Sequence, residues 1–205
     1  MTATRRGRPG YDVDSLLAVA VKVFNEKGYD GTSMEELSHR LGRTKSAIYH
    51  HVSGKEELLR LALDRALDAL FAVTDEPAFH TGRAIERLEY LVRRSVLVLA
   101  DELPYVTLLL RVRGNTKVER QALARRRKFD RIVSDLVAEA EAEGDVRPDV
   151  HPAVTARLLF GTVNSLIEWY RPRGEQAARE LADAVCTVAF GGLRVRGRLS
   201  GKLEG

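Results

Sequence analysis

Two short helical segments joined at Gly42 occupy residues 32–55, with the sequence TSMEELSHRLGRTKSAIYHHVSGK. The S-x-x-E spacing of Ser33 and Glu36 predicts a capping box that begins the first of these helices. Thr44 can cap the second helix, and the glycine between them permits a tight turn. Two short helices connected in this way have the geometry of a helix-turn-helix, which places its second helix in the major groove of DNA.

The outer face of the second helix carries groups that suit a DNA groove. Arg43 and Lys45 can donate to guanine or to phosphate, and Tyr49 offers both a phenol and a flat apolar ring. Helix starts also favour phosphate because their amides are free. The candidate DNA contacts are Thr32, Ser33, Arg43, Thr44, Lys45, Ser46, Tyr49, His50 and Lys55. The alternative is a helical hairpin whose polar residues are merely solvated.

The rest of the chain is also expected to be helical, which makes the fold class all-α. Leu, Ala, Val, Glu and Arg dominate, aromatic residues are 6%, and no alternating strand of useful length occurs. Proline and glycine divide the pattern into segments. The expected helices cover about residues 12–27, 33–41, 44–51, 53–73, 83–101, 104–112, 117–143, 152–171 and 175–195.

We expect two domains. Residues 1–55 form an N-terminal arm and a three-helix DNA-binding domain, and residues 56–200 form a larger helical domain. The helix at 53–73, opened by a capping box of Ser53 and Glu56, connects them, and Pro77 and Gly82 bracket a linker.

Several functional classes lack their sequence signals. A single cysteine, Cys186, excludes an intramolecular disulfide, and its apolar surroundings indicate a buried, unreactive thiol. No apolar run exceeds six residues, far too few to cross a bilayer, and the N-terminus does not resemble a secretory signal. No phosphate loop, metal-ligand spacing or nucleophile elbow occurs; the adjacent His50 and His51 point about 100° apart on a helix. We expect a cytoplasmic protein with no metal or cofactor and no enzymatic activity.

The N-terminal block resembles the DNA-binding domain of the TetR family of bacterial repressors. The matching pieces are FNEKGYDGTS, MEELSHRLG and TKSAIYHHVSGKEELL, which together cover about residues 11–60. Val52 departs from the pattern, because the family usually has phenylalanine there. The resemblance implies that the residues named above at 43–46, 49, 50 and 55 contact DNA. It also suggests that Arg5, Arg6 and Arg8 enter the minor groove, with solubilising charge as the alternative.

The same resemblance implies a C-terminal domain that binds a small effector and forms a homodimer. The helices at about 152–171 and 175–195 fit a dimer interface, since both are apolar and contain small residues that allow close crossing. A dimer would hold two recognition helices roughly 34 Å apart and read a palindromic operator. The alternative is that both helices are fully buried within the monomer.

Two segments of the C-terminal half, residues 103–116 and 160–172, mix bulky apolar residues with isolated polar ones, as a ligand pocket does. The candidate ligand-binding residues are Tyr105, Leu108, Arg111, Asn115, Phe160, Asn164, Glu168 and Trp169. Ordinary core packing is the alternative for each.

The WYRP segment at 169–172 resembles a TetR subset that senses acyl-coenzyme A thioesters such as phenylacetyl-coenzyme A. A basic cluster could then bind the coenzyme A phosphates, or it could be a solvated helix face. The cluster consists of Arg120, Arg125, Arg126, Arg127, Lys128 and Arg131. Two rival functions stay open: a DNA-organising protein that no ligand releases, and an enzyme acting on a coenzyme A thioester.

Overall fold

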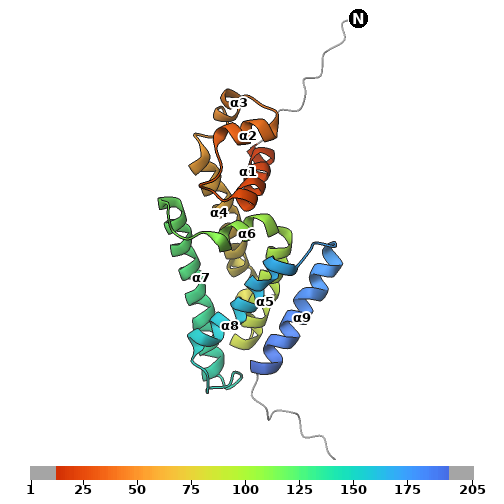
Figure 1. The fold of residues 1–205 in the computed structure, drawn as a ribbon. Coiled ribbons are helices and arrows are strands. Elements are labelled where there is room, and N and C mark those ends of the chain that lie inside the picture. The colour runs from red at the N-terminus through yellow and green to blue at the C-terminus, as the bar shows by residue number, and fades with distance from the viewer. Residues whose placement is uncertain (1–12, 194–205) are drawn as a thin grey trace, which may run out of the picture.

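The computed structural model describes residues 13–193, and every regular element in that range is helical (Figure 1). The all-α prediction is therefore confirmed for these residues, while Arg5, Arg6 and Arg8 lie outside them. The α-helices are α1 (Val13–Lys27), α2 (Met34–Leu41), α3 (Lys45–Tyr49), α4 (Lys55–Ala72), α5 (Ala84–Asp101), α6 (Leu103–Arg111), α7 (Lys117–Ala142), α8 (Pro152–Trp169) and α9 (Glu175–Leu193). Two 3₁₀ turns follow α4: η1 (Val73–Asp75) precedes the expected linker, and η2 (Pro77–His80) lies within it.

The helix-turn-helix forms as its local signals predict. Gly42 ends α2 with a φ of 61°, a left-handed conformation that glycine adopts without strain. The hydroxyl of Thr44 accepts the amide of Ala47 and so caps α3. Ser33 accepts the amide of Glu36 in the same way at the start of α2. Val52 is buried, so the smaller side chain still anchors the pair internally.

The start of α4 differs from the prediction. Both the amide and the hydroxyl of Ser53 donate to the carboxylate of Glu57, at 2.6 and 2.7 Å. These bonds lower the pKa of Glu57. Gly54 is the cap residue and makes no side-chain bond, so α4 begins at Lys55. The capping box of Ser53 with Glu56 was wrong because the carboxylate one residue later reaches the serine instead.

Helix α5 lies at the centre of the C-terminal domain (Figure 1). Leu88, Leu91, Val92 and Val96 are completely buried on it. Helix α9 packs against one side of α5, α7 packs against it as well, and α8 lies along α7. A helix that is buried on several sides in this way fixes the positions of the others.

Helix α4 joins the two parts, because it packs against α1 in the N-terminal domain and against α6 and α7 in the C-terminal domain. A second joint lies between α1 and α6, where the amide group of Asn25 donates to the carbonyl of Pro104 at 2.8 Å. Arg65 of α4 also binds Glu102, just before α6, through two bonds of 2.8 and 3.0 Å. The N-terminal helices are therefore connected to the C-terminal core at both α4 and α6.

The loop between α6 and α7 depends on a buried carboxylate, that of Glu119. Its Oε2 accepts the backbone amides of Arg113, Gly114 and Asn115, at 3.3, 2.7 and 2.8 Å. These three bonds hold the end of α6 against the first turn of α7. A buried carboxylate with this many amide donors is expected to be stabilising, since its charge is well compensated.

Cys186 of α9 is buried against α5, and this burial raises the pKa of its thiol to about 11. We predict that a disulfide reagent at pH 8 modifies the native protein at least about a hundredfold more slowly than the urea-unfolded chain, because the thiolate is the reacting form. Equal rates for the two forms would contradict the prediction. The release of the reagent's chromophore measures both rates.

We predict that Glu119→Ala lowers the free energy of unfolding by about 2 kcal/mol, because three amides lose their acceptor. Asp135→Ala is the matched control: Asp135 is an exposed carboxylate on the same helix, and its removal should change stability by less than about 0.5 kcal/mol. Urea titrations followed by circular dichroism measure both. Equal midpoints for the two variants would show that the loop does not need this carboxylate.

A candidate nucleic-acid interface and an enclosed pocket

The outer face of α3 is exposed to solvent. Tyr49 shows 50% of its surface, an unusual value for an aromatic residue, and Ser46 and His50 are exposed beside it. Ile48 points inward and is buried. This division leaves one polar face of a short, well-braced helix available to a partner, at the end of the molecule farthest from α9 in Figure 1.

Basic and hydroxyl groups surround the start of α3. Lys45 is exposed and forms an ion pair with Glu35 of α2. The cap oxygens of Ser33 and Thr44 each accept one backbone amide, which leaves their O–H groups able to donate to a phosphate. Arg43 lies in the exposed turn between the helices. The arrangement offers several hydrogen-bond donors to an anionic partner, and the carboxylate of Glu35 would compete with that partner for Lys45.

Thr32 does not belong to this surface. It is 3% exposed, its hydroxyl donates to the carbonyl of Gly28 at 2.8 Å, and its amide donates to Tyr29. Both donors are thus used inside the chain, where they stabilise the turn between α1 and α2. We therefore remove Thr32 from the candidate DNA contacts.

Lys55 has a structural partner in addition to any external one. Its ammonium donates to the carbonyl of Tyr29 at 2.9 Å and lies 4.2 Å from the centre of the Tyr29 ring. An ammonium has three N–H donors, so this bond leaves others for a phosphate. Burial raises the pKa of the Tyr29 phenol. Lys55 thus fastens the α1–α2 turn to the first turn of α4.

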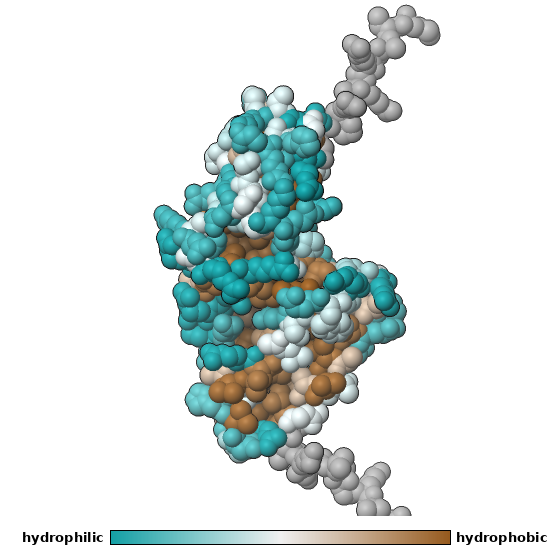
Figure 2. All heavy atoms as spheres, viewed as in Figure 1, coloured by the Kyte–Doolittle hydropathy of each residue, from teal (hydrophilic) through white to brown (hydrophobic). Residues whose placement is uncertain are grey.

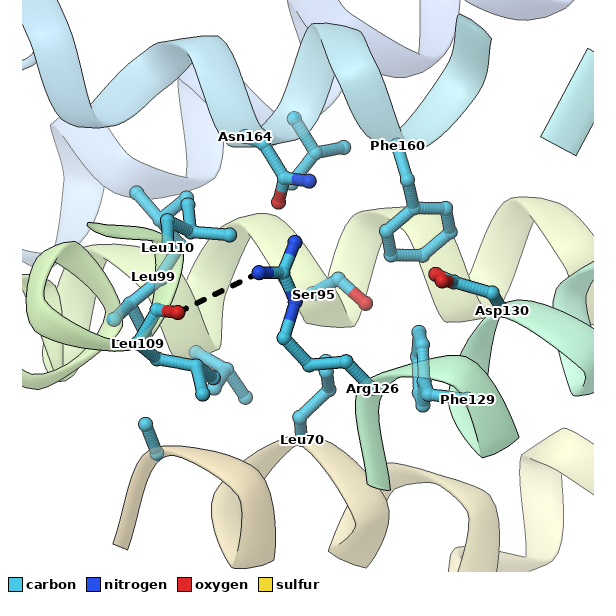
Figure 3. Close-up of a pocket in the computed structure, with 14 residues that line it drawn as sticks. Leu70, Ser95, Leu99, Leu109, Leu110, Arg126, Phe129, Asp130, Phe160 and Asn164 are labelled. Atoms are coloured by element: carbon cyan, nitrogen blue, oxygen red, sulfur yellow. Dashed lines mark hydrogen bonds between the residues drawn. The ribbon is translucent and has the colours of Figure 1, made fainter. Parts of the chain in front are cut away.

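A small cavity of about 50 Å³ lies in the C-terminal domain where α4, α5, α6, α7 and α8 meet (Figure 3). Its walls are mainly apolar. The polar groups on its boundary come from Ser95, Arg126, Asp130 and Asn164. The apolar lining residues are Ala66, Leu70, Val98, Leu99, Val106, Leu109, Leu110, Phe129, Phe160 and Val163.

A larger groove of about 400 Å³ follows the line between α7 and α8. It shares four residues with the small cavity: Arg126, Asp130, Phe160 and Asn164. Arg131 and Arg157 also line this groove. We call the small cavity the inner chamber and the larger one the outer groove; the two meet at the four shared residues.

Two of the eight predicted ligand-binding residues, Phe160 and Asn164, line the inner chamber. The other six do not line the inner chamber or the outer groove. Tyr105 is buried against the guanidinium of Arg65, 4.3 Å from its ring centre. Arg111 donates to the carbonyl of Asn25, at the joint between α6 and α1.

The remaining four predicted residues lie in the core, in a loop or on the surface. Leu108 is buried within the core, and Asn115 belongs to the loop held by Glu119. Glu168 and Trp169 are exposed in the last turn of α8, with 58% of the tryptophan surface open. In this turn Leu166 is buried, whereas Glu168 and Trp169 lie on the solvent-exposed side of α8.

The basic cluster of α7 is divided among different partners. Arg125 pairs with Asp64 and Asp68 of α4, at 3.0 and 2.5 Å, and Arg120 donates to the carbonyls of Gly114 and Asn115. Arg127, Lys128 and Arg131 are exposed. Binding of coenzyme A phosphates by the cluster stays a prediction, whereas Arg120 and Arg125 already have partners within the chain.

Arg126 was predicted only as one member of the basic cluster that could bind coenzyme A phosphates, and not as a residue of the pocket lining. Its guanidinium occupies the centre of the view in Figure 3. Its Nη1 donates to the carbonyl of Leu109 at 3.5 Å. Burial lowers the pKa of Arg126, and the nearby Asp130 partly opposes this shift. The sequence held a usable signal: Arg126 precedes the buried Phe129 and Val133 by three and seven residues, the spacing of one helix face.

Two kinds of site lack support in the described part of the chain. Between residues 13 and 193 no three histidine, cysteine or acidic side chains gather as metal ligands would. None of the helices in that range combines the length and the apolar composition that a membrane crossing requires.

Comparison with known families gives matches at both ends of the chain. Residues 16–62 match the model of bacterial regulatory proteins of the tetR family, and residues 81–193 match a tetracyclin repressor-like C-terminal domain. A crystal structure of a TetR-family regulator from Streptomyces coelicolor A3 is 57% identical, covers 95% of this chain and 94% of its own, and superposes with a TM-score of 0.84.

Two more distant relatives are similar to this protein over most of its length. The transcriptional repressor KstR2 of Mycobacterium tuberculosis is 26% identical over 192 residues, which are 89% of this chain and 92% of the relative. AibR, solved in complex with isovaleryl coenzyme A and operator DNA, is 25% identical, with 86% of this chain and 97% of its own covered and a TM-score of 0.72.

Proposed function

Because the chain belongs to the TetR family of bacterial regulators, we propose that it is a repressor that binds a palindromic operator as a homodimer and is released by a small effector. The family consists of DNA-binding transcriptional regulators, so the chain is not an enzyme. Two features together carry the proposal. Helix α3 is capped and exposed, and the C-terminal core contains a mainly apolar chamber. The cytoplasm, where the DNA lies, is the proposed location.

In the proposed complex α3 enters the major groove. Tyr49, Ser46 and His50 face the bases or the adjacent phosphates, because their side chains are exposed on one side of the helix. Arg43, Lys45 and the cap hydroxyls of Ser33 and Thr44 surround them with donors. Lys55 keeps its bond to Tyr29 and offers a remaining N–H to phosphate.

The proposed dimer interface uses α8 and α9. Leu158 and Val188 expose 65% and 76% of their surfaces, which is costly in water for large apolar side chains. Val154 and Trp169 are exposed on α8 as well, and Figure 2 shows apolar surface over the lower part of the C-terminal domain. Covering these residues with a second copy would remove them from water and fix the spacing of two α3 helices.

The proposed effector is a small amphipathic molecule, and an acyl-coenzyme A thioester is the favoured class. The apolar lining of the inner chamber suits the acyl group of such an effector, and the arginines of the outer groove suit its anionic portion. The complex of AibR with isovaleryl coenzyme A supports this class by similarity. Phenylacetyl-coenzyme A is a second candidate within it.

Release requires the effector to favour an arrangement that cannot hold both α3 helices in the operator. Helices α4 and α6 line the chamber and also contact α1 of the DNA-binding domain. A ligand shifts this equilibrium only by its different affinity for the two arrangements. The rival function, a DNA-organising protein without a ligand, predicts binding that no metabolite changes.

The experiment that tests the proposal is selection of genomic fragments by the purified protein, followed by footprinting of the bound sequence. Protection confined to one palindrome, and its loss on adding an acyl-coenzyme A thioester, would support the proposal. Weak protection of many unrelated sequences, unchanged by every thioester, would favour the DNA-organising alternative.

We predict that Lys45→Ala weakens operator binding and lowers the slope of log affinity against log salt by about two units, since each protomer of the dimer loses one phosphate contact. Glu35→Gln should have the opposite effect and tighten binding, because it removes the carboxylate that pairs with Lys45. Lys117→Ala, at the start of α7, is the matched control. A slope for Lys45→Ala equal to that of the control would exclude the phosphate contact. Fluorescence anisotropy over a salt series gives the slopes.

We predict that Val188→Asp converts the protein into a monomer and abolishes binding to the palindrome, because the carboxylate would be buried in the interface. Val13→Asp is the control: Val13 is also exposed, at 37%, but lies on α1. Sedimentation velocity gives the masses. A dimer that persists in Val188→Asp would move the interface away from this face of α9.

A further inference from the structure

Arg126 is the one arginine among the four side chains at the junction between the inner chamber and the outer groove. It lines both spaces, and Figure 3 shows its guanidinium between Leu109 and Asn164, with apolar side chains around it. The aliphatic stem comes from α7, whereas the charged head reaches toward α6. A molecule that occupied both spaces would lie beside this head.

The charge of Arg126 is poorly compensated. Within residues 13–193 it forms no ion pair with a carboxylate, and its one hydrogen bond there is the long contact of 3.5 Å to the carbonyl of Leu109. Asp130 lies one turn further along α7, is exposed at the groove, and attracts the guanidinium from a distance. A half-buried cation without a close counter-charge gains free energy when an anion approaches it.

The acceptor of that long bond belongs to the last turn of α6. The carbonyl of Leu109 would bond to the amide of Arg113 if α6 continued, but α6 ends at Arg111 and the Arg113 amide donates to Glu119 instead. Arg126 therefore supplies the carbonyl with a donor and places a positive charge at the negative end of the helix dipole. The guanidinium stabilises the C-terminal end of α6 when no ligand is bound.

We propose that Arg126 is the effector-binding residue of this chain, and that it takes an oxygen anion or a thioester carbonyl attached to a short apolar group lying in the inner chamber. This assignment rests on the proposed ligand-responsive function and adds the orientation and the size class of the ligand. The apolar group points inward, and the polar remainder of the molecule lies along α7 and α8 in the outer groove.

The chamber limits the apolar group. Its accessible space is about 50 Å³, small beside the 400 Å³ of the outer groove. A compact branched group such as that of isovalerate therefore requires less widening of the chamber than a phenyl ring with its methylene. We accordingly expect isovaleryl compounds to bind more tightly than phenylacetyl compounds.

The outer groove distinguishes a free carboxylic acid from its coenzyme A thioester, which carry the same apolar group. It carries Arg126, Arg131 and Arg157 against Asp130, so its charge is positive. A free carboxylate would place its charge on Arg126 and would not need the two outer arginines. A coenzyme A thioester would place its carbonyl at Arg126 and its phosphates near Arg131 and Arg157.

This binding mode also links a ligand in the chamber to the DNA-binding domain. A ligand oxygen, carboxylate or thioester carbonyl, that takes the N–H now donated to Leu109 would leave that carbonyl without its donor and would draw the guanidinium from the end of α6. Helix α6 contacts α1 through Pro104 and Arg111, both bonded to Asn25. The loss at one end of α6 therefore acts on a helix whose other contacts reach the DNA-binding domain.

Calorimetric titration of the full chain tests the assignment, with isovaleryl-coenzyme A, phenylacetyl-coenzyme A, the two free acids and coenzyme A alone as probes. We expect isovaleryl-coenzyme A or isovalerate to bind, and Arg126→Gln to weaken that binding tenfold to a hundredfold, as expected for a lost charge-assisted bond. Arg127→Gln is the matched control, since Arg127 is an exposed neighbour on the same helix. Arg131→Gln should weaken the thioester but leave the free acid unchanged.

Three results would overturn the assignment: equal affinities for Arg126→Gln and Arg127→Gln, tighter binding of the phenylacetyl than the isovaleryl compounds, or no binding of any probe to the wild-type chain. Arg126→Lys, which keeps the charge but not the two-pronged donor, should bind with intermediate affinity, and its melting temperature controls for folding. Operator binding by the same variants separates the two proposals. A variant that still binds the operator but no longer responds to the ligand bears on Arg126 alone, whereas absence of operator binding by the wild-type chain bears on the proposed function.

Discussion

The apolar face of α4 is the contact on which the rest of the structure depends. Leu58, Leu59, Leu63 and Leu67 are all buried along it, and each buried leucine contributes roughly 1.5–3 kcal/mol. Helix α4 packs against α1 of the N-terminal domain and against α6 and α7 of the C-terminal domain. Because one continuous helix serves both, neither domain can change its packing on α4 without affecting the other.

The sequence predicted the N-terminal domain well because its signals are local. A cap hydroxyl, a left-handed glycine and an apolar spacing of three and four residues act within one or two helical turns, and all three are found around Gly42. Even here a one-residue competition went undetected, since Ser53 binds Glu57 and not Glu56. The all-helical class and the helix order followed from the same local rules.

The candidate ligand site could not be predicted in the same way. Five helices supply its lining, and which residues meet there depends on their crossing angles, which no short pattern encodes. Phe160 and Asn164 were found because they lie on the inner face of α8, whereas Trp169, only five residues after Asn164, lies outside. Arg126 was hidden within a run of arginines whose members turned out to have separate partners.

The bond between Lys55 and Tyr29 has a mechanical consequence. It clamps the corner before α2 onto the first residue of α4, so α2 and α3 follow the end of that helix as a rigid unit. With 18 residues, α4 is about 27 Å long. A swing of about 5° around its buried far end would carry the clamped corner sideways by about 2 Å, which approaches the length of a hydrogen bond. A small rotation of α4 about its buried end would therefore displace α2 and α3 enough to disturb their contacts with DNA.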